Sequence, residues 1–194
     1  MTARAIHAAE VAKPTLVVVS GPPGSGKTSL AHELARAIPC PALSRDEIKE
    51  GMVHAHCGPY ETGRGDPLTQ RTFPLFFEVL RVLLAGGVSV VAEAAFQDRL
   101  WRQGLEPLEE LAQLRIVQCR VDVAVARERA ADRGAQWGRV EAHGDSLASL
   151  GPQGWEQGFA SFERLSIAAP SLEVDTTDDY VPQLATVVAF VNRP

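Results

Sequence analysis

The sequence contains little cysteine and no long apolar run, and each absence excludes a class of protein. Its three cysteines, Cys40, Cys57 and Cys119, have no C-x-x-C spacing, and their odd number argues against a disulfide framework. No stretch approaches the roughly 20 apolar residues of a membrane span, and residues 1–13 lack the central apolar block of a signal peptide. We therefore expect a cytoplasmic protein with no membrane partner and a flexible N-terminus at residues 1–13.

Positive charge is also scarce. The chain has 19 lysines and arginines against 24 aspartates and glutamates, a formal net charge of −5, so no overall positive field attracts nucleic acid. A zinc site is not expected either, because His54, His56 and Cys57 have no matching second cluster of ligands. What is present is a globular composition, since 45% of the 194 residues are hydrophobic, enough for the core of one domain.

The apolar pattern predicts strands that alternate with helices. Strands are expected at 15–20, 42–44, 88–92, 115–121 and 171–175, and helices at 28–37, 47–54, 73–84, 98–113, 123–133, 155–167 and 181–191. Pro74 should lie in the first turn of its helix, behind a Thr72 cap, because a proline further inside would break the helix. The alternation predicts one three-layer α/β domain over residues 1–194, with a mostly parallel five-stranded sheet.

The most specific motif is Gly21-Pro22-Pro23-Gly24-Ser25-Gly26-Lys27-Thr28, which fits G-x-x-x-x-G-K-[ST] at every fixed position. A β-branched run precedes it and a helical pattern follows, the order that this phosphate-binding loop requires. Its backbone N–H groups and the helix N-terminus bind an anion, Lys27 reaches the terminal phosphates, and the Thr28 hydroxyl is placed for Mg²⁺. We predict a site for ATP and Mg²⁺ in this loop, extending to Ser29.

Two carboxylates follow predicted strands at the sheet edge where open parallel sheets bind their ligands. Asp46, after strand 42–44, is the leading candidate for a catalytic base. The alternative is that Ser44 or Asp46 caps the following helix, and the two roles can coexist. Glu93 ends strand 88–92, where phosphate-loop proteins hold Mg²⁺, usually with an aspartate. Direct coordination, coordination through water and a structural role all remain open for Glu93.

Basic residues and two polar segments complete the predicted site. Arg129 and Arg133 share a face of helix 123–133 and can clamp phosphates, or else form a solvated face paired with Glu128 and Asp132. Segment 54–68 is predicted to be a flap on the acceptor side, and segment 134–151 a lid. Within the flap, Arg64 and Asp66 either touch an acceptor or are solvated loop charges.

With these residues in place, the chain resembles the small phosphate-loop kinases grouped with the kinase domain of phage polynucleotide kinase, chloramphenicol phosphotransferase, gluconate kinase and the zeta toxins. The likeness rests on the phosphate-binding loop, the segment Ser44-Arg45-Asp46-Glu47-Ile48-Lys49, Glu93, the arginine pair and Val174-Asp175-Thr176-Thr177. It covers most of the chain and implies a P-loop fold with sheet order 2-3-1-4-5.

The resemblance also implies roles. The aspartate matching Asp46 takes the proton from the acceptor hydroxyl, and the residue matching Lys49, where polynucleotide kinase has arginine, contacts substrate. We also predict Arg45 and Glu93 as substrate contacts. Further implied roles are stabilisation of the transferring phosphoryl group by Arg133, with Arg129 as a second candidate, and binding of adenine near the loop that follows Asp175.

Three functions follow from these patterns. The first is an ATP-dependent kinase that phosphorylates a hydroxyl of a small molecule, such as a sugar, nucleoside or antibiotic. The second, a polynucleotide 5′-hydroxyl kinase, is disfavoured by the acidic charge balance. The third is a regulatory module that binds ATP without catalysis, against which Asp46 and Glu93 argue together. The sequence does not indicate the acceptor or the oligomeric state.

Overall fold

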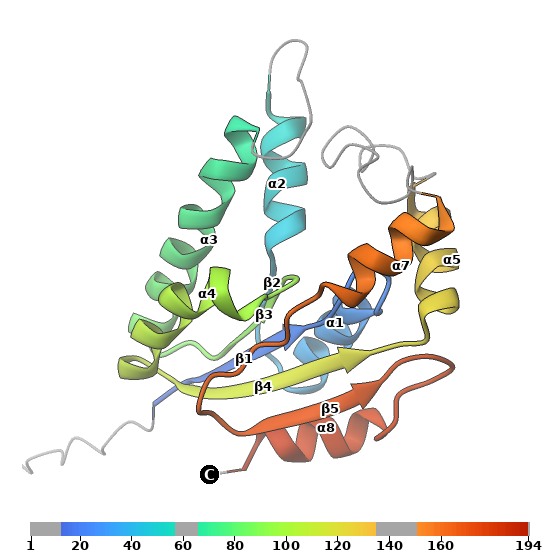
Figure 1. Ribbon diagram of the computed structural model, residues 1–194. Helices are drawn as coiled ribbons and strands as arrows, with labels where there is room; N and C mark the ends of the chain where they lie inside the picture. Colours follow the sequence, from blue (N-terminus) through green and yellow to red (C-terminus); the bar gives the residue numbers. More distant parts are fainter. Residues whose placement is uncertain (1–12, 57–65, 135–150, 194) are drawn as a thin grey trace, which may run out of the picture.

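The core of the protein is a five-stranded, all-parallel sheet in the order β2-β3-β1-β4-β5, seen in a computed structural model that describes residues 13–56, 66–134 and 151–193 (Figure 1). The strands are β1 (Thr15–Ser20), β2 (Ala42–Ser44), β3 (Val90–Glu93), β4 (Gln113–Arg120) and β5 (Ser171–Asp175). This confirms the mostly parallel five-stranded sheet that the sequence predicts and the strand order that the family resemblance implies.

Helices cover both faces of the sheet. They are α1 (Lys27–Ala37), α2 (Arg45–His54), α3 (Pro67–Ala85), α4 (Asp98–Leu105), the 3-10 helix η1 (Glu106–Glu110), α5 (Val123–Gly134), α7 (Pro152–Ala160) and α8 (Leu184–Val191). Alternate residues of β1 point to opposite faces. Leu16 and Val18 join a core with α3 and α4, whereas Val17 and Val19 join a second core with α1 and α8. None of the described helices has the length and apolar character to cross a membrane.

Helix α3 begins earlier than predicted. Asp66 caps it, because its Oδ1 accepts a hydrogen bond from the Thr69 amide at 2.8 Å, and Pro67 occupies the first turn. The prediction that Pro74 starts this helix behind a Thr72 cap was therefore wrong. Pro74 lies inside the helix, and the buried Thr72 hydroxyl donates to the Leu68 carbonyl at 2.6 Å. The proline rule was outweighed by tertiary packing of the apolar face of α3 against the sheet.

Other element ends also differ from the sequence prediction. The expected helix 98–113 is divided, because Pro107 lies in the first turn of η1 and β4 already begins at Gln113. The expected helix 155–167 ends at Ala160, and the chain beyond it buries Leu165 and Ile167 in the α3 and α4 core. Helix α8 begins three residues later than predicted, at Leu184.

The parallel sheet brings the carboxyl ends of its strands to one edge. There, Glu93 of β3 lies in register with Ser44 of β2 on one side and with Val19 of β1 on the other. Helices α2 and α3 stand together on one side of this edge, and α5 and α7 stand on the other (Figure 1). The phosphate-binding loop and the predicted base therefore share one end of the molecule.

Candidate active site

The phosphate-binding loop joins β1 to α1, as the sequence predicts. Gly24 and Gly26 have left-handed backbone conformations, with φ of 78° and 67°, which strongly favour glycine. At Gly24, a Cβ atom would also lie 2.2 Å from the Ala126 carbonyl oxygen. Among the described residues, the buried Ser25 hydroxyl has no hydrogen-bond partner. The loop is thus a tight turn at the N-terminus of α1, which fits an anion such as the phosphates of ATP.

Lys27 lies over this loop with its ammonium group nearly buried. Its Nζ donates to the Pro22 carbonyl oxygen at 3.4 Å and lies 4.0 Å from Oε1 of Glu93. Both distances are long for a charged donor. Within the described part of the chain, the ammonium group therefore has hydrogen-bonding capacity left for an anionic ligand.

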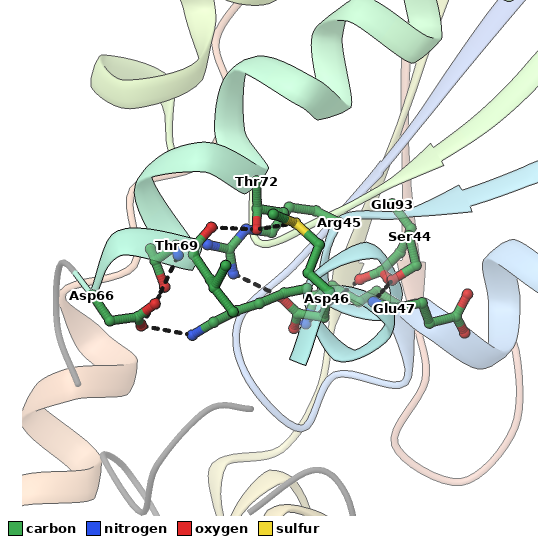
Figure 2. Close-up of polar contacts among 12 residues, drawn as sticks. Ser44, Arg45, Asp46, Glu47, Asp66, Thr69, Thr72 and Glu93 are labelled. Carbon is green, nitrogen blue, oxygen red and sulfur yellow. Dashed lines mark hydrogen bonds and ion pairs between the residues drawn. The ribbon is translucent and has the colours of Figure 1, made fainter. Parts of the chain in front are cut away.

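Glu93 is the buried carboxylate of the site, with 2% of its surface exposed. Its Oε2 accepts a hydrogen bond from the Ser44 hydroxyl at 2.6 Å (Figure 2). Burial raises the pKa of the Glu93 carboxyl, although the Lys27 charge and hydrogen bonds from Ser44 and Thr28 lower it. An additional positive charge would favour the ionised form, and carboxylate and hydroxyl oxygens are suitable ligands for Mg²⁺. Glu93 and Thr28 therefore fit the predicted role in holding Mg²⁺.

Asp46 lies in the first turn of α2, beside Glu93. Its Oδ1 accepts a hydrogen bond from Arg45 Nη1 at 2.9 Å, and 42% of its side chain is exposed. The negative charge of Asp46 is close enough to raise the pKa of Glu93. The cap of α2 is Ser44, whose Oγ accepts from the Glu47 amide at 3.5 Å. The structure thus gives the capping role to Ser44 and leaves the Asp46 carboxylate at the site.

Glu47, the neighbouring carboxylate, points away from the site (Figure 2). Its Oε1 lies 2.7 Å from Nε2 of His32 on α1. Two adjacent acidic residues are therefore directed to different surroundings, because successive residues of a helix lie on different faces. Only Asp46 of this pair lies beside Glu93 in the described structure.

Lys49 is buried between α2 and α3. Its Nζ donates to Oδ2 of Asp66 at 2.8 Å, and the two side chains are only 3% and 4% exposed. The same Oδ2 accepts from the Thr69 hydroxyl at 2.7 Å. Asp66 is therefore not a solvated loop charge, because it caps α3 and joins it to α2. Contact of Lys49 with a substrate stays a prediction.

We expect Asp66→Asn to lower the free energy of unfolding by about 3 kcal/mol, because asparagine can still cap α3 but leaves the Lys49 ammonium group buried without its counter-ion. Chemical denaturation of the variant measures this. The matched control is the double variant Lys49→Met/Asp66→Asn, which should recover part of the loss because no charge remains buried. Wild-type stability in the single variant would contradict a structural role for the pair.

The guanidinium group of Arg129 binds backbone oxygens of the segment that follows β5. Its Nη1 donates to the Thr176 carbonyl oxygen at 2.8 Å, and its Nη2 donates to the Thr177 carbonyl oxygen at 2.7 Å. The guanidinium group thus holds the loop that follows β5. It is not part of a plain solvated face, and direct contact with a phosphoryl group stays a prediction for Arg129.

A pocket of ≈ 540 Å³ lies beside the phosphate-binding loop. Its lining comes from the loop, α1, α5 and the segment after β5: Gly26, Ser29, Glu33, Arg129, Asp132, Thr176, Asp178, Asp179 and Tyr180. Asp175 itself does not line it. Its Oδ1 accepts from the Thr177 amide at 2.9 Å and its Oδ2 pairs with Arg120 at 2.8 Å, and the Thr177 bonds lower the pKa of Asp175. Asp175 thus shapes the loop that lines the pocket.

Several predicted features fall outside the described structure. These are the side chain of Arg133, the flap centre at 57–65 including Arg64, and residues 135–150 of the lid. In the described residues, no group of three or more His, Cys, Asp or Glu side chains is arranged to hold a metal ion.

Residues 16–150, well over half of the chain, match the family described as AAA domain (AAA_33). The chain belongs to this AAA domain family. The match begins in β1 and extends through the phosphate-binding loop, Asp46, Glu93 and α5. The matched residues therefore include the loop with the phosphate-binding motif, Asp46 and Glu93.

Known proteins resemble this AAA domain over different lengths. A protein from Chloroflexus aurantiacus with a provisional kinase assignment superposes with a TM-score of 0.79 at 26% identity, covering 92% of this chain and 97% of the other. The APS kinase CysC of Mycobacterium tuberculosis, solved with AMPPNP and APS, superposes with a TM-score of 0.63 at 15% identity. The superposition covers 94% of this chain and 99% of the APS kinase. Shikimate kinase of Corynebacterium efficiens is 37% identical over 57 residues, which are 29% of this chain and 33% of that enzyme. The chain thus matches about a third of the shikimate kinase, and the APS kinase likeness shows the fold.

Sequence reasoning about this AAA domain missed two contacts of the site. The first is the hydrogen bond from Ser44 to Glu93, which depends on the pairing of β2 with β3. The second is the set of bonds around Thr176, which joins segments 151 residues apart. The adjacent strand tips offered a signal for the first contact, but no sequence pattern indicates the second.

Proposed function

We propose that this protein is an ATP-dependent kinase that transfers the γ-phosphate to a hydroxyl group of a small molecule. The observation that carries the proposal is the meeting of three charged groups at one sheet edge. Lys27 lies over the phosphate-binding loop, Glu93 lies 4.0 Å from it, and the exposed carboxylate of Asp46 is near Glu93. A site that only binds ATP needs Lys27. A partly exposed carboxylate at the same edge, Asp46, is suited to accept a proton from the acceptor hydroxyl.

Each residue has a role in such a reaction. Phosphoryl transfer has a loose transition state, so the protein mainly positions the groups and stabilises negative charge. Lys27 and the loop amides would bind the phosphates, and Mg²⁺ held by Thr28 and Glu93 would supply further positive charge. Asp46, oriented by Arg45 at 2.9 Å, would accept the proton of the acceptor hydroxyl.

Small-molecule acceptors are favoured over nucleic acid. The net charge of −5 gives no long-range attraction for a polyanion. In the acceptor region that the structure describes, Arg45 and Lys49 each form an ion pair with an aspartate. Two of the relatives, shikimate kinase and APS kinase, are named for small molecules.

The test is a transfer assay on the full chain. ATP labelled in the γ-phosphate is incubated with Mg²⁺ and a library of small hydroxyl compounds, beside DNA and RNA with 5′-hydroxyl ends. We expect label on a small molecule and none on the oligonucleotides. Label on an oligonucleotide end would reverse the choice of acceptor, and ATP binding without any transfer would support a regulatory module instead.

Glu93→Gln should raise the Mg²⁺ concentration needed for half-maximal activity by about tenfold, with a smaller change in nucleotide affinity. The substitution removes the charge but keeps the shape of the side chain. A Mg²⁺ titration of activity measures the effect, and exposed Glu110→Gln is the matched control. An unchanged titration would make Glu93 a structural residue.

The stability of Glu93→Gln should also depend on pH differently from that of the wild type. Because burial raises the folded-state pKa of Glu93, the folded protein binds this proton more strongly than the unfolded chain, and wild-type stability falls as pH rises from about 4.5 through the raised value. Glutamine has no such titration. The melting temperature of Glu93→Gln relative to wild type should therefore increase between pH 5 and pH 8.

A further inference from the structure

Thr176, the first residue after β5, connects the phosphate-binding loop to the end of β4. It is buried, with 4% of its surface exposed. Its Oγ1 lies 2.8 Å from the Ser25 carbonyl oxygen and 3.1 Å from the Arg120 carbonyl oxygen. The Arg120 oxygen already accepts from the Thr176 amide at 2.9 Å. The single hydroxyl hydrogen therefore serves the nearer acceptor, Ser25.

Arg129 holds the same residue from α5. Its two terminal nitrogens donate to the carbonyl oxygens of Thr176 and Thr177. A Cβ atom built on Gly26 would lie 3.7 Å from Thr176 Oγ1 and from Arg129 Nη1, so this side of the glycine turn faces Thr176 and Arg129. Gly26, Arg129 and Thr176 also line the pocket beside the loop.

The bond to Ser25 fixes the direction of one amide in the phosphate-binding loop. The Ser25 carbonyl and the Gly26 N–H belong to one peptide unit, which is planar and trans, so the two groups point in opposite directions. When Thr176 holds the carbonyl oxygen, the Gly26 N–H is directed away from Thr176. Glycine at a φ of 67° would otherwise allow this peptide unit to rotate.

We propose that Thr176 is a positioning residue for nucleotide binding, which orients the Gly26 peptide through Ser25 and joins the phosphate-binding loop and the adjacent pocket into one unit. The inference rests on the proposed function in that the ligand is a nucleoside triphosphate. If Thr176 acts on the loop itself, its loss weakens the binding of phosphate groups whether or not a nucleoside is attached. If it only shapes the pocket, phosphates without a nucleoside bind as before.

The test is calorimetry on the full chain with Mg²⁺, using ATP and inorganic tripolyphosphate as separate probes. Thr176→Val keeps the shape of the side chain but removes the donor. We expect its affinity for both probes to fall by about tenfold, which corresponds to about 1.4 kcal/mol, and the KM for ATP to rise in parallel. Thr176→Ser keeps the hydroxyl and should bind both probes within about twofold of wild type.

Two results would overturn the proposal: unchanged affinity for both probes, or a loss confined to ATP. Thermal melts identify a variant that does not fold, and Thr176→Ala then takes the place of the valine variant, since it also lacks the donor and adds no bulk. Failure of wild-type protein to bind ATP would contradict the proposed function instead. The tripolyphosphate affinities of the variants would still test the role of Thr176 at the loop.

Discussion

Lys27→Ala should reduce the rate of phosphoryl transfer by about 10³-fold or more while the fold is retained. The ammonium group is the buried positive charge over the phosphate-binding loop, and it forms no short hydrogen bond, since the Pro22 oxygen lies at 3.4 Å and Oε1 of Glu93 at 4.0 Å. The fold is retained because Glu93, whose pKa burial raises, can bind a proton when the lysine charge is lost. In the transition state, the ammonium group would face phosphate oxygens in a site with little water, where removal of one donor typically costs about 10² to 10³ in rate. The additional loss comes from weaker binding of ATP.

The measurement combines single-turnover transfer, calorimetric ATP binding and a thermal melt. Lys13→Ala is the matched control, because the exposed Lys13 amine donates to the Glu109 carbonyl oxygen, far from the loop. It should behave as wild type. Phosphoryl transfer at the wild-type rate in Lys27→Ala would show that this loop does not bind the phosphate donor.

The local parts of the site were predictable from sequence. The phosphate-binding motif specifies its own geometry, because left-handed glycines and a helix start are needed at fixed positions, and the structure has both at Gly24 and Gly26. The ends of β2 and β3 were also visible as apolar runs that stop at polar residues. The strands could be expected because each such run needs a buried position in a parallel sheet, whereas their order was implied by the resemblance to the small phosphate-loop kinases.

The parts that were missed depend on contacts between distant segments. Asp66 reads as an exposed loop charge in the sequence, and only the approach of α2 to α3 buries it against Lys49. The two bonds from Arg129 to carbonyl oxygens of the turn after β5 were likewise not visible in the sequence, whereas contact of Arg129 with a phosphoryl group stays a prediction. Backbone acceptors carry no sequence signature, so side chains that bind them cannot be assigned from residue types alone.

Pro74 shows that contacts between distant segments also decide where a helix begins. Proline rules describe the isolated helix, whereas α3 is held by the apolar side chains that it buries on the sheet. Phe76 and Phe77 both contact the ring of Trp101, with centroids 5.8 Å apart in each case. Such packing offsets the loss of one backbone hydrogen bond.

Asp46→Asn separates a kinase from a protein that only binds ATP. Asparagine keeps the size of the side chain and can still contact Arg45, but it cannot take a proton from a hydroxyl group. Transfer should therefore fall by about 10² or more, whereas ATP affinity and melting temperature should change little. The stability of α2 is not at risk, because its cap is Ser44. Single-turnover transfer beside calorimetry and a melt gives all three quantities.

Glu47→Gln is the matched control for this substitution, since it makes the same chemical change one residue away. The Glu47 carboxylate faces His32 at 2.7 Å and points away from Glu93 and Asp46 (Figure 2). We expect the Glu47 variant to transfer phosphate at close to the wild-type rate. An active Asp46→Asn protein combined with an inactive Glu47→Gln protein would move the base to Glu47, and it would require α2 to rotate when the acceptor binds. Loss of transfer in Asp46→Asn alone would assign proton abstraction to the carboxylate that the helix start holds beside Glu93.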